Sequence, residues 1–385
     1  PGADVRIPNF GDIVYAFSGM WKRKGYNVEI LPDPDQETLA LGERHSLGKE
    51  CLPYAIITGE LLRLHQACNG RKLAFYVPSL SFPCLLQQYG PGLRQLMADR
   101  GIDNITLTSP NATELIALFG VDAGEAFYMG LLAIELLVKA TCEIRPYELE
   151  KGMTQALHRE NLRRIEEAVA GGNVADALDE SLRKLAGIRV DTSERRPLIG
   201  ISGDIYAKSS RQMGGNLFLW LERQGLEVWP SPFNIDFLDF SITRWFLRSV
   251  SRLELSEMIA AGSIALKRTI DVWRMKYTVG NRIRRIDEPG YLELKHLASP
   301  YITNEEDELL FVNIAKIIDF HHRGADGIIN TACFNCMVGN ASAAIIEKIR
   351  RDYPDTPIMT AIQSGVSDPS RRMALEAFVG QVKEN

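Results

Sequence analysis

The hydrophobic and polar positions of the chain follow one pattern that occurs twice. Each copy has a short apolar run, a Gly-Asp-Ile turn, a helical stretch closed by a glycine and a second apolar run. These parts lie at 5–8, 11–13, up to Gly25 and 27–32 in the first copy, and at 197–201, 203–205, up to Gly225 and 226–230 in the second. Strand, turn, helix and strand in this order form a βαβ unit, so we expect two similar α/β domains.

Each half continues with two further apolar runs that end at turn residues. They lie at 73–77 and 104–108 in the first half, and at 327–330 and 357–361 in the second. Because helical stretches separate the runs, the sheets that they form are expected to be parallel.

These elements predict an α/β fold of two Rossmann-like (flavodoxin-like) parallel-sheet domains with helical insertions. We expect an N-terminal domain over 1–124, a helical connecting segment over 125–195 and a C-terminal domain over 196–385. The connecting segment is broken at Pro146 and at 171–172, and a helical insertion at about 235–285 lies inside the C-terminal domain.

Length and charge narrow the classes of protein. A chain of 385 residues suits two or three domains. Its 44 Lys and Arg against 49 Asp and Glu give a net charge of −5, which argues against broad binding to nucleic acid or to an anionic membrane. The most apolar stretch, 129–138, is short and contains Glu135, so we expect no membrane span. The sequence begins at Pro1 without a signal peptide, and it leaves open whether the chain is trimmed or cut from a longer polypeptide.

Six cysteines are the main candidates for chemistry. They are too few and too scattered for a disulfide scaffold, so we expect reduced thiols in the cytoplasm. They are Cys51, Cys68, Cys84, Cys142, Cys333 and Cys336.

Three of the cysteine segments lie where open parallel sheets bind ligands, at the carboxyl ends of strands. Cys84 follows the run that ends at 77, and Cys336 follows the run that ends at 330. Cys51 precedes an apolar helix, whose N-terminus is expected to favour the thiolate. A cleft between the domains would gather these three thiols around one iron–sulfur cluster.

Each cysteine also has a simpler interpretation as a small buried hydrophobe. We expect this for Cys68 and Cys142, which lie on helical stretches, and leave it open for Cys51 and Cys84. Residues 333–336 form a C-x-x-C between a strand and a helix, which fits a thioredoxin-like pair and is weak evidence for zinc.

Other motifs add little. The chain has no phosphate-binding G-x-x-x-x-G-K-[ST], no G-x-S-x-G and no histidine spacing typical of zinc hydrolases. A basic run between Lys267 and Arg285 reads as a solvated helix face, with contact to an anionic partner or to coenzyme A phosphates as the alternative.

Seven short segments, in order, resemble one protein family. They are Ile7–Asp12, Gly48–Pro53 with Thr58–Leu62, Pro83-Cys84 with Gln88–Gly90, Arg145–Glu148, Gly203–Tyr206, Cys336–Gly339 and Leu375–Phe378. The chain is similar to the activase-associated relatives of 2-hydroxyacyl-CoA dehydratase subunits, often labelled CoA protein activase. It departs from the family at Phe82 and at 85–87, where the family has Gly and Arg-Phe-Gly, and at Val338, where the family has Pro.

The resemblance implies facing α/β domains and a [4Fe–4S] cluster held by Cys51, Cys84 and Cys336, with an open fourth iron position and Cys333 as reserve ligand. A double-cubane cluster would present similar cysteines. From their positions in the sequence alone, the loop 203–206 and Lys49 are candidates for tuning the potential of such a cluster.

The function implied is an iron–sulfur redox component of the 2-hydroxyacyl-CoA dehydratase or reductase type. An ATP-dependent activase of actin-like fold would donate electrons, and an acyl-CoA or another difficult acceptor would receive them. Two alternatives stay open: a non-enzymatic iron–sulfur electron carrier or assembly factor, and a metal-free two-domain binding protein. No catalytic acid–base pair stands out, and a homo- or hetero-oligomer is possible.

Overall fold

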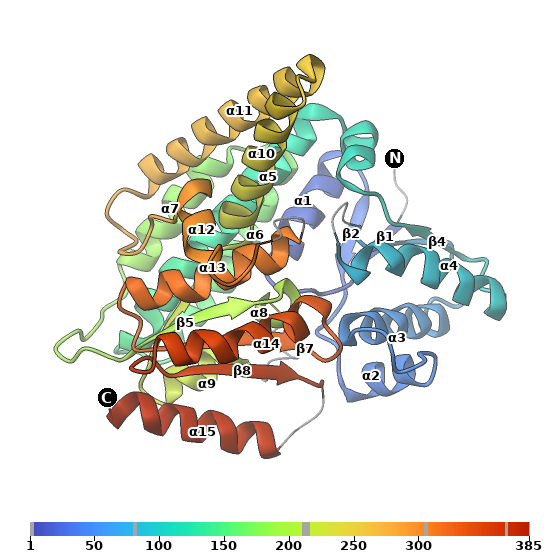
Figure 1. Cartoon of the computed structure of the whole chain (residues 1–385). Coiled ribbons are helices and arrows are strands. Elements are labelled where there is room, and N and C mark those ends of the chain that lie inside the picture. Colours follow the sequence, from blue (N-terminus) through green and yellow to red (C-terminus); the bar gives the residue numbers. More distant parts are fainter. Residues whose placement is uncertain (1–3, 80–82, 210–215, 304–306, 366–368, 385) are drawn as a thin grey trace.

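Two parallel four-stranded sheets form the framework of the protein. The computed structural model describes residues 4–79, 83–209, 216–303, 307–365 and 369–384 (Figure 1). The sheets have the orders β2-β1-β3-β4 and β6-β5-β7-β8, and every strand pair in them is parallel. The predicted α/β class with two Rossmann-like sheets and helical insertions is therefore confirmed.

The first sheet is built around β1. Its strands are β1 (Asp4–Ile7), β2 (Asn27–Ile30), β3 (Leu73–Tyr76) and β4 (Ile105–Thr108). The helices that connect them are α1 (Val14–Arg23), α2 (Gln36–Glu43), α3 (Leu52–Ala67) and α4 (Tyr89–Arg100), with a short 3₁₀ helix, η1 (Leu85–Gln88), before α4. Val5 and Ile7 are fully buried because β1 has strands on both sides and helices over its faces.

The second sheet repeats this order around β5. Its strands are β5 (Leu198–Gly203), β6 (Glu227–Pro230), β7 (Gly327–Cys333) and β8 (Ile358–Gln363). Its helices include α8 (Ile205–Ser209), α9 (Leu217–Arg223), α13 (Glu308–His322), α14 (Met337–Asp352) and α15 (Pro369–Glu384). Strand β7 is longer than the sequence pattern predicts and ends at Cys333 itself, because residues 331–333 remain in register with β8.

Long helices connect and cover the two sheets. Helices α5 (Ala112–Ile144), α6 (Met153–Gly171) and α7 (Val174–Ala186) follow the first sheet, and α10 (Phe233–Ser251), α11 (Leu255–Val279) and α12 (Tyr291–Ala298) are inserted between β6 and α13. The breaks expected near Pro146 and at 171–172 are present, and a further kink lies at Gly120 in α5. Within the described residues, no helix is both long and apolar enough to cross a membrane.

Part of the predicted basic run is buried, which corrects its interpretation as a solvated face. Arg268 is 8% exposed and forms an ion pair with Asp239. Arg284 and Arg285 both pair with Glu227 at the start of β6. Acidic side chains of neighbouring elements bind these cations, and a sequence pattern does not reveal such partners.

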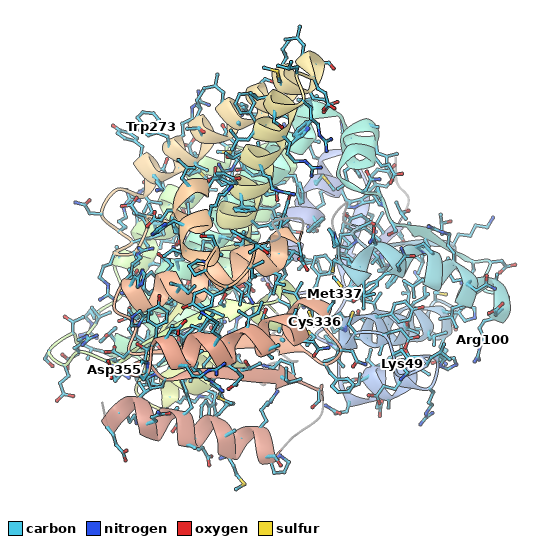
Figure 2. All side chains as sticks on the ribbon, in the orientation of Figure 1. Lys49, Arg100, Trp273, Cys336, Met337 and Asp355 are labelled. Carbon is cyan, nitrogen blue, oxygen red and sulfur yellow. The ribbon has the colours of Figure 1, made fainter. Side chains whose placement is uncertain are left out.

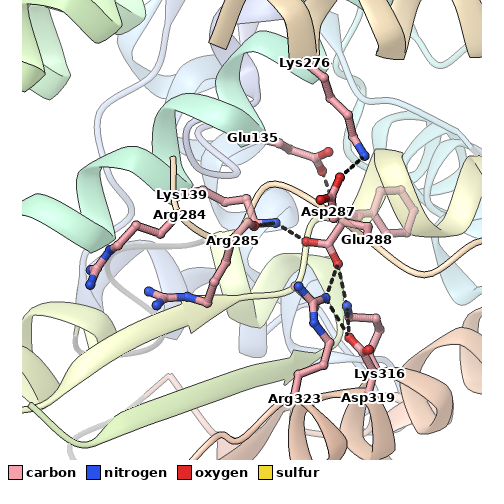
Figure 3. A network of polar contacts seen from close by, with 12 residues as sticks. Glu135, Lys139, Lys276, Arg284, Arg285, Asp287, Glu288, Lys316, Asp319 and Arg323 are labelled. Carbon is pink, nitrogen blue, oxygen red and sulfur yellow. Dashed lines mark hydrogen bonds and ion pairs between the residues drawn. The ribbon is translucent and has the colours of Figure 1, made fainter. Parts of the chain in front are cut away.

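A buried charge network anchors the loop after α11 (Figure 3). The carboxylate of Glu288 accepts from Lys139 of α5, and at 2.6 Å from Lys316 of α13. Lys316 also donates to Asp319 at 2.6 Å. Burial alone would raise the pKa of Glu288, but the two ammonium groups outweigh it and hold that pKa well below its usual range.

Candidate functional site at the domain interface

Four cysteines meet where the carboxyl edges of the two sheets face each other. Cys51 caps the N-terminus of α3, Cys84 caps η1, and Cys336 caps α14. Cys333 is the last residue of β7. Cys51 and Cys84 are close enough to Cys336 for their charges to raise its pKa, and Cys51 and Cys336 act in the same way on Cys333. The three sequence-predicted candidates and the reserve cysteine therefore all lie near the interface between the two domains.

Hydrogen bonds from the backbone and from one side chain hold the C-x-x-C segment against the first domain. The amide of Leu52 donates to the carbonyl of Phe334 at 3.1 Å. The side-chain amide of Asn335 donates to the carbonyls of Gly48 and Glu50, at 3.1 and 3.3 Å. Asn335 has a φ of 60°, a left-handed conformation that Asn tolerates better than most residues. Figure 1 shows α2 and α3 beside β7 and α14 at this interface.

Apolar contacts close the same interface. Side chains from both domains form one small buried cluster, composed of Leu39, Leu52, Ala55, Ile56, Ala207 and Cys333. The side-chain amide of Gln36 also donates to the carbonyl of Gly365 at 2.7 Å, across the domain boundary. Cys333 is consequently buried in this apolar interface, Cys336 is partly buried beside it, and Cys84 is part-exposed.

Asp204 is a partly buried carboxyl beside Cys333. It accepts hydrogen bonds from the amides of Ala207, at 2.7 Å, and Cys333, and its Oδ1 lies 3.5 Å from the Sγ of Cys333. Burial raises the pKa of Asp204 above its ordinary value. The turn before Asp204 packs closely against β7, and only glycine fits there. The φ of Gly203 is +125°, and a Cβ atom at this position would lie 1.8 Å from the carbonyl oxygen of Thr331.

Tyr89 is a member of the site that the sequence analysis did not assign. Its hydroxyl lies 2.7 Å from the Sγ of Cys51, and burial raises its pKa well above the usual range, so it remains protonated. The residue stands in the Gln88–Gly90 segment that carries part of the family resemblance. That segment was the one available signal, because nothing in the sequence pairs position 89 with position 51.

The expectation that a helix N-terminus favours the Cys51 thiolate is wrong for this environment. Burial raises the pKa of Cys51 to about 11, although the hydrogen bond with Tyr89 opposes the shift. Burial also raises the pKa values of Cys84, Cys333 and Cys336. Without a bound cation, the four sulfurs are neutral thiols at pH 7, which does not suit a thioredoxin-like nucleophile.

We tested the site's donor set against the implied cluster. Among the described residues, no three His, Cys, Asp or Glu side chains are grouped closely enough to hold a single metal ion. An iron–sulfur cluster separates its ligands by its own width and therefore needs a wider group of thiols. Thiolates are the preferred ligands of such a cluster. The positive charge of the iron would stabilise these sulfurs as thiolates, which their surroundings alone do not. The backbone amides of Gly339 and Leu86 donate to the sulfurs of Cys336 and Cys84, at 3.4 and 3.5 Å. In their chemistry, though not in a spacing that holds a single ion, these thiols and amide donors suit such a cluster.

Of the other predicted residues, Cys68, Cys142 and Lys49 lie away from these thiols, and Tyr206 packs beside them. Cys68 and Cys142 are each 1% exposed and, as expected, are buried in helical surroundings. Lys49 is exposed, and its side chain makes no hydrogen bond or ion pair with the described part of the chain (Figure 2). Tyr206 is half-buried against the interface cluster that contains Cys333.

A second polar constellation lies in a cavity of about 130 Å³ beside α8. There His158 of α6 makes two hydrogen bonds, with its Nε2 2.7 Å from Asp12 and its Nδ1 2.8 Å from Thr141. Lys208 donates to the hydroxyl of Ser231 at 2.8 Å on another wall. The sequence analysis missed this group, since no local spacing links Asp12 with a histidine in the connecting helices.

Comparison with known proteins identifies no relative of this chain among protein-family models or curated sequences. No protein-family model matches the chain, and no curated protein sequence matches it significantly. The resemblance to dehydratase relatives therefore depends on the seven segments alone.

Proposed function

We propose that the chain is an iron–sulfur redox protein of the 2-hydroxyacyl-CoA dehydratase type. One observation carries the proposal: Cys51 and Cys84 of the first domain and Cys336 of the second, each the N-cap residue of a helix, lie near the interface between the domains. Cys51, Cys84 and Cys336 would hold a [4Fe–4S] or double-cubane cluster, with Cys333 as the reserve ligand. When bound, such a cluster supplies low-potential one-electron transfer.

The chain's own residues would bind and tune the group. Amides that donate to the sulfurs of Cys84 and Cys336 stabilise their thiolates, and the Tyr89 hydroxyl does the same for Cys51. Asp204 would add negative charge beside Cys333 and so disfavour reduction, which lowers the potential. The apolar interface would shield Cys333 and, in part, Cys336 from solvent.

The proposed partners follow from the motif order. An ATP-dependent activase would donate the electron, and an acyl-CoA thioester or a similarly difficult acceptor would receive it. The proposal also places the protein in a reducing compartment such as the cytoplasm, because all six cysteines are free thiols. Turnover of acyl-CoA in the presence of the activase distinguishes this enzyme from an electron carrier or an assembly factor.

The decisive measurement is iron and acid-labile sulfide per chain on anaerobically purified protein, with EPR after dithionite reduction. We expect about four of each, or about eight for a double cluster. Replacing Cys51, Cys84 or Cys336 with Ala should abolish the signal, and Cys333→Ala tests the reserve ligand. Cys68→Ala is the control, because Cys68 is equally a free thiol but lies at the far end of α3. Absence of iron and sulfide after anaerobic reconstitution would leave a metal-free binding protein.

A further inference from the structure

Helix α11 exposes a regular apolar stripe. Its members are spaced alternately by four and three residues: Ile259, Ser263, Leu266, Ile270, Trp273 and Tyr277. Ile259, Leu266, Trp273 and Tyr277 are 64–79% exposed, and Ile270 is 38% exposed. The helix runs along the outer edge of the molecule, and Trp273 points away from it (Figures 1 and 2).

The opposite face of α11 already packs against the protein. Ala261, Met275 and Val279 are buried there, and the last two belong to the large core that also includes residues of α5 and α7. Arg268 and Asp271 on the same face are buried too. The orientation of the helix is therefore fixed, with the stripe directed outward.

The spacing of the stripe identifies the kind of partner. An apolar repeat of 3.5 residues is the seam of a coiled coil, which packs against another helix. A monomeric protein rarely exposes a continuous apolar patch of this kind. Trp273 and Tyr277 alone each offer on the order of 150–250 Å² for burial, against about 800 Å² per partner in an interface of standard size.

We propose that α11 pairs with α11 of a second copy, antiparallel, about a two-fold axis between residues 266 and 270. In this register Leu266 faces the partner's Ile270, and Ile259 faces the partner's Tyr277. The small Ser263 faces the partner's Trp273, so the largest side chain meets the smallest position of the stripe. A parallel pair would instead place Trp273 against the partner's Trp273 and leave a gap between the two serines.

The flanking charges agree with the antiparallel register. Lys267 would lie at the two-fold axis, where its charge is already balanced by Glu125 and Asp271, at 2.8 and 2.6 Å. Arg274 would face the partner's Ala260 and lie one helical turn from the partner's Glu257. Within the described residues Arg274 has no ion pair, so the second copy would supply one.

The first test is the mass of the native chain in solution by sedimentation equilibrium. We expect a dimer, and Leu266→Glu should raise its dissociation constant at least about 100-fold, because each dimer loses two buried leucines. Leu118→Glu is the matched control: Leu118 is 61% exposed on α5, against 64% for Leu266, and its replacement should leave the dimer intact. A native monomer at tens of micromolar, or a dimer that Leu266→Glu does not affect, would overturn the proposal.

A second test reads the register directly by cross-linking with a short bis-maleimide, relative to the native chain. Lys267→Cys should give a covalent dimer, since position 267 faces its own copy. Ser256→Cys, on the same face, should not, because an antiparallel pair separates the two copies of position 256 by about 36 Å. Cross-linking at 256 but not at 267 would contradict the antiparallel pair. So would binding of the native chain to anionic vesicles that Leu266→Glu abolishes, which would assign the stripe to a membrane surface.

Discussion

The two sheets have the same strand order, and each has a Gly-Asp turn after its first strand, yet the two aspartates have different partners. Asp12 binds His158 in the connecting helices at 2.7 Å. Asp204 is partly buried and accepts from the amides of Ala207 and Cys333 in its own domain. The shared topology determines where these carboxyls lie, and the element packed against each turn determines their chemistry.

The glycines before the two aspartates also differ in which part of the protein they contact. A Cβ at Gly11, whose φ is +96°, would lie 2.3 Å from the carbonyl oxygen of Ser209 in the second domain. A Cβ at Gly203 would instead meet the carbonyl oxygen of Thr331 in its own sheet. The first turn is a contact between domains, whereas the second turn is part of one domain and holds the thiol site.

The largest effect of a single substitution is expected at the second turn. Gly203→Ala adds a Cβ at a left-handed φ and only 1.8 Å from Thr331, so it should destabilise the second domain by about 3 kcal/mol or more. Urea unfolding followed by fluorescence measures this. Gly25→Ala is the control, since Gly25 also has a positive φ but has open space around it, and should cost about 1–2 kcal/mol. Equal costs for the two variants would show that the contact with Thr331 is unimportant.

A buried carboxyl of α3 lies next to the first turn, and it should make the stability of the protein depend on pH. Burial raises the pKa of Glu60 in α3 to about 8, although a hydrogen bond with the backbone of Asn9 opposes the shift. A raised pKa in the folded state gives stability that is complete below the unfolded value of 4.5 and is lost as the pH rises through about 8. The free energy of unfolding of the native protein should therefore fall by on the order of 5 kcal/mol over this range.

Glu60→Gln checks the assignment, because its unfolding free energy should depend less on pH across the same window. Unfolding titrations at pH 5, 7 and 9 make the comparison. A pH dependence that is identical in the native chain and in Glu60→Gln would rule out Glu60 as its source.

A smaller effect is expected at the histidine that binds Asp12. His158→Ala removes buried hydrogen bonds to Asp12 and Thr141 and should cost about 2–3 kcal/mol, measured by thermal unfolding. The iron content proposed for the thiol site should not change, because His158 lies in the separate cavity. Loss of iron in this variant would mean that the two turns act as one site.

The smallest expected effect is at the loop that joins the domains. Asn335→Ala removes two hydrogen bonds to the first domain and introduces strain at a positive φ, and it should cost about 1–2 kcal/mol. Asn335→Gly keeps the backbone conformation and should cost less. Hydrogen exchange at Gly48–Glu50 reports the loosening, and equal exchange in both variants and the native chain would contradict the docking role.

The strands and the parallel sheets could be predicted from the sequence because each strand has its own short apolar run, and the same order of runs occurs in both halves. The strands lie within a few residues of their apolar runs, and the topology alone sends Cys84 and Cys336 to the carboxyl edges of their sheets. The role of Tyr89 and the pairing of Asp12 with His158 depend on contacts between distant segments. The protonation of the thiols depends on burial, which their positions at helix N-termini do not reveal.

The division of the thiol site between the domains has a consequence for how the protein is made. Asn335 and Glu50, which hydrogen-bond across the interface, are 285 residues apart in the chain. At about 5–20 residues per second, a ribosome needs roughly 15 to 60 s to synthesise that interval. Throughout it, Cys51 and Cys84 have been translated but lack the partners that later bury them. The site is thus completed late in biosynthesis, and until then its first two thiols depend on a reducing environment for protection against oxidation.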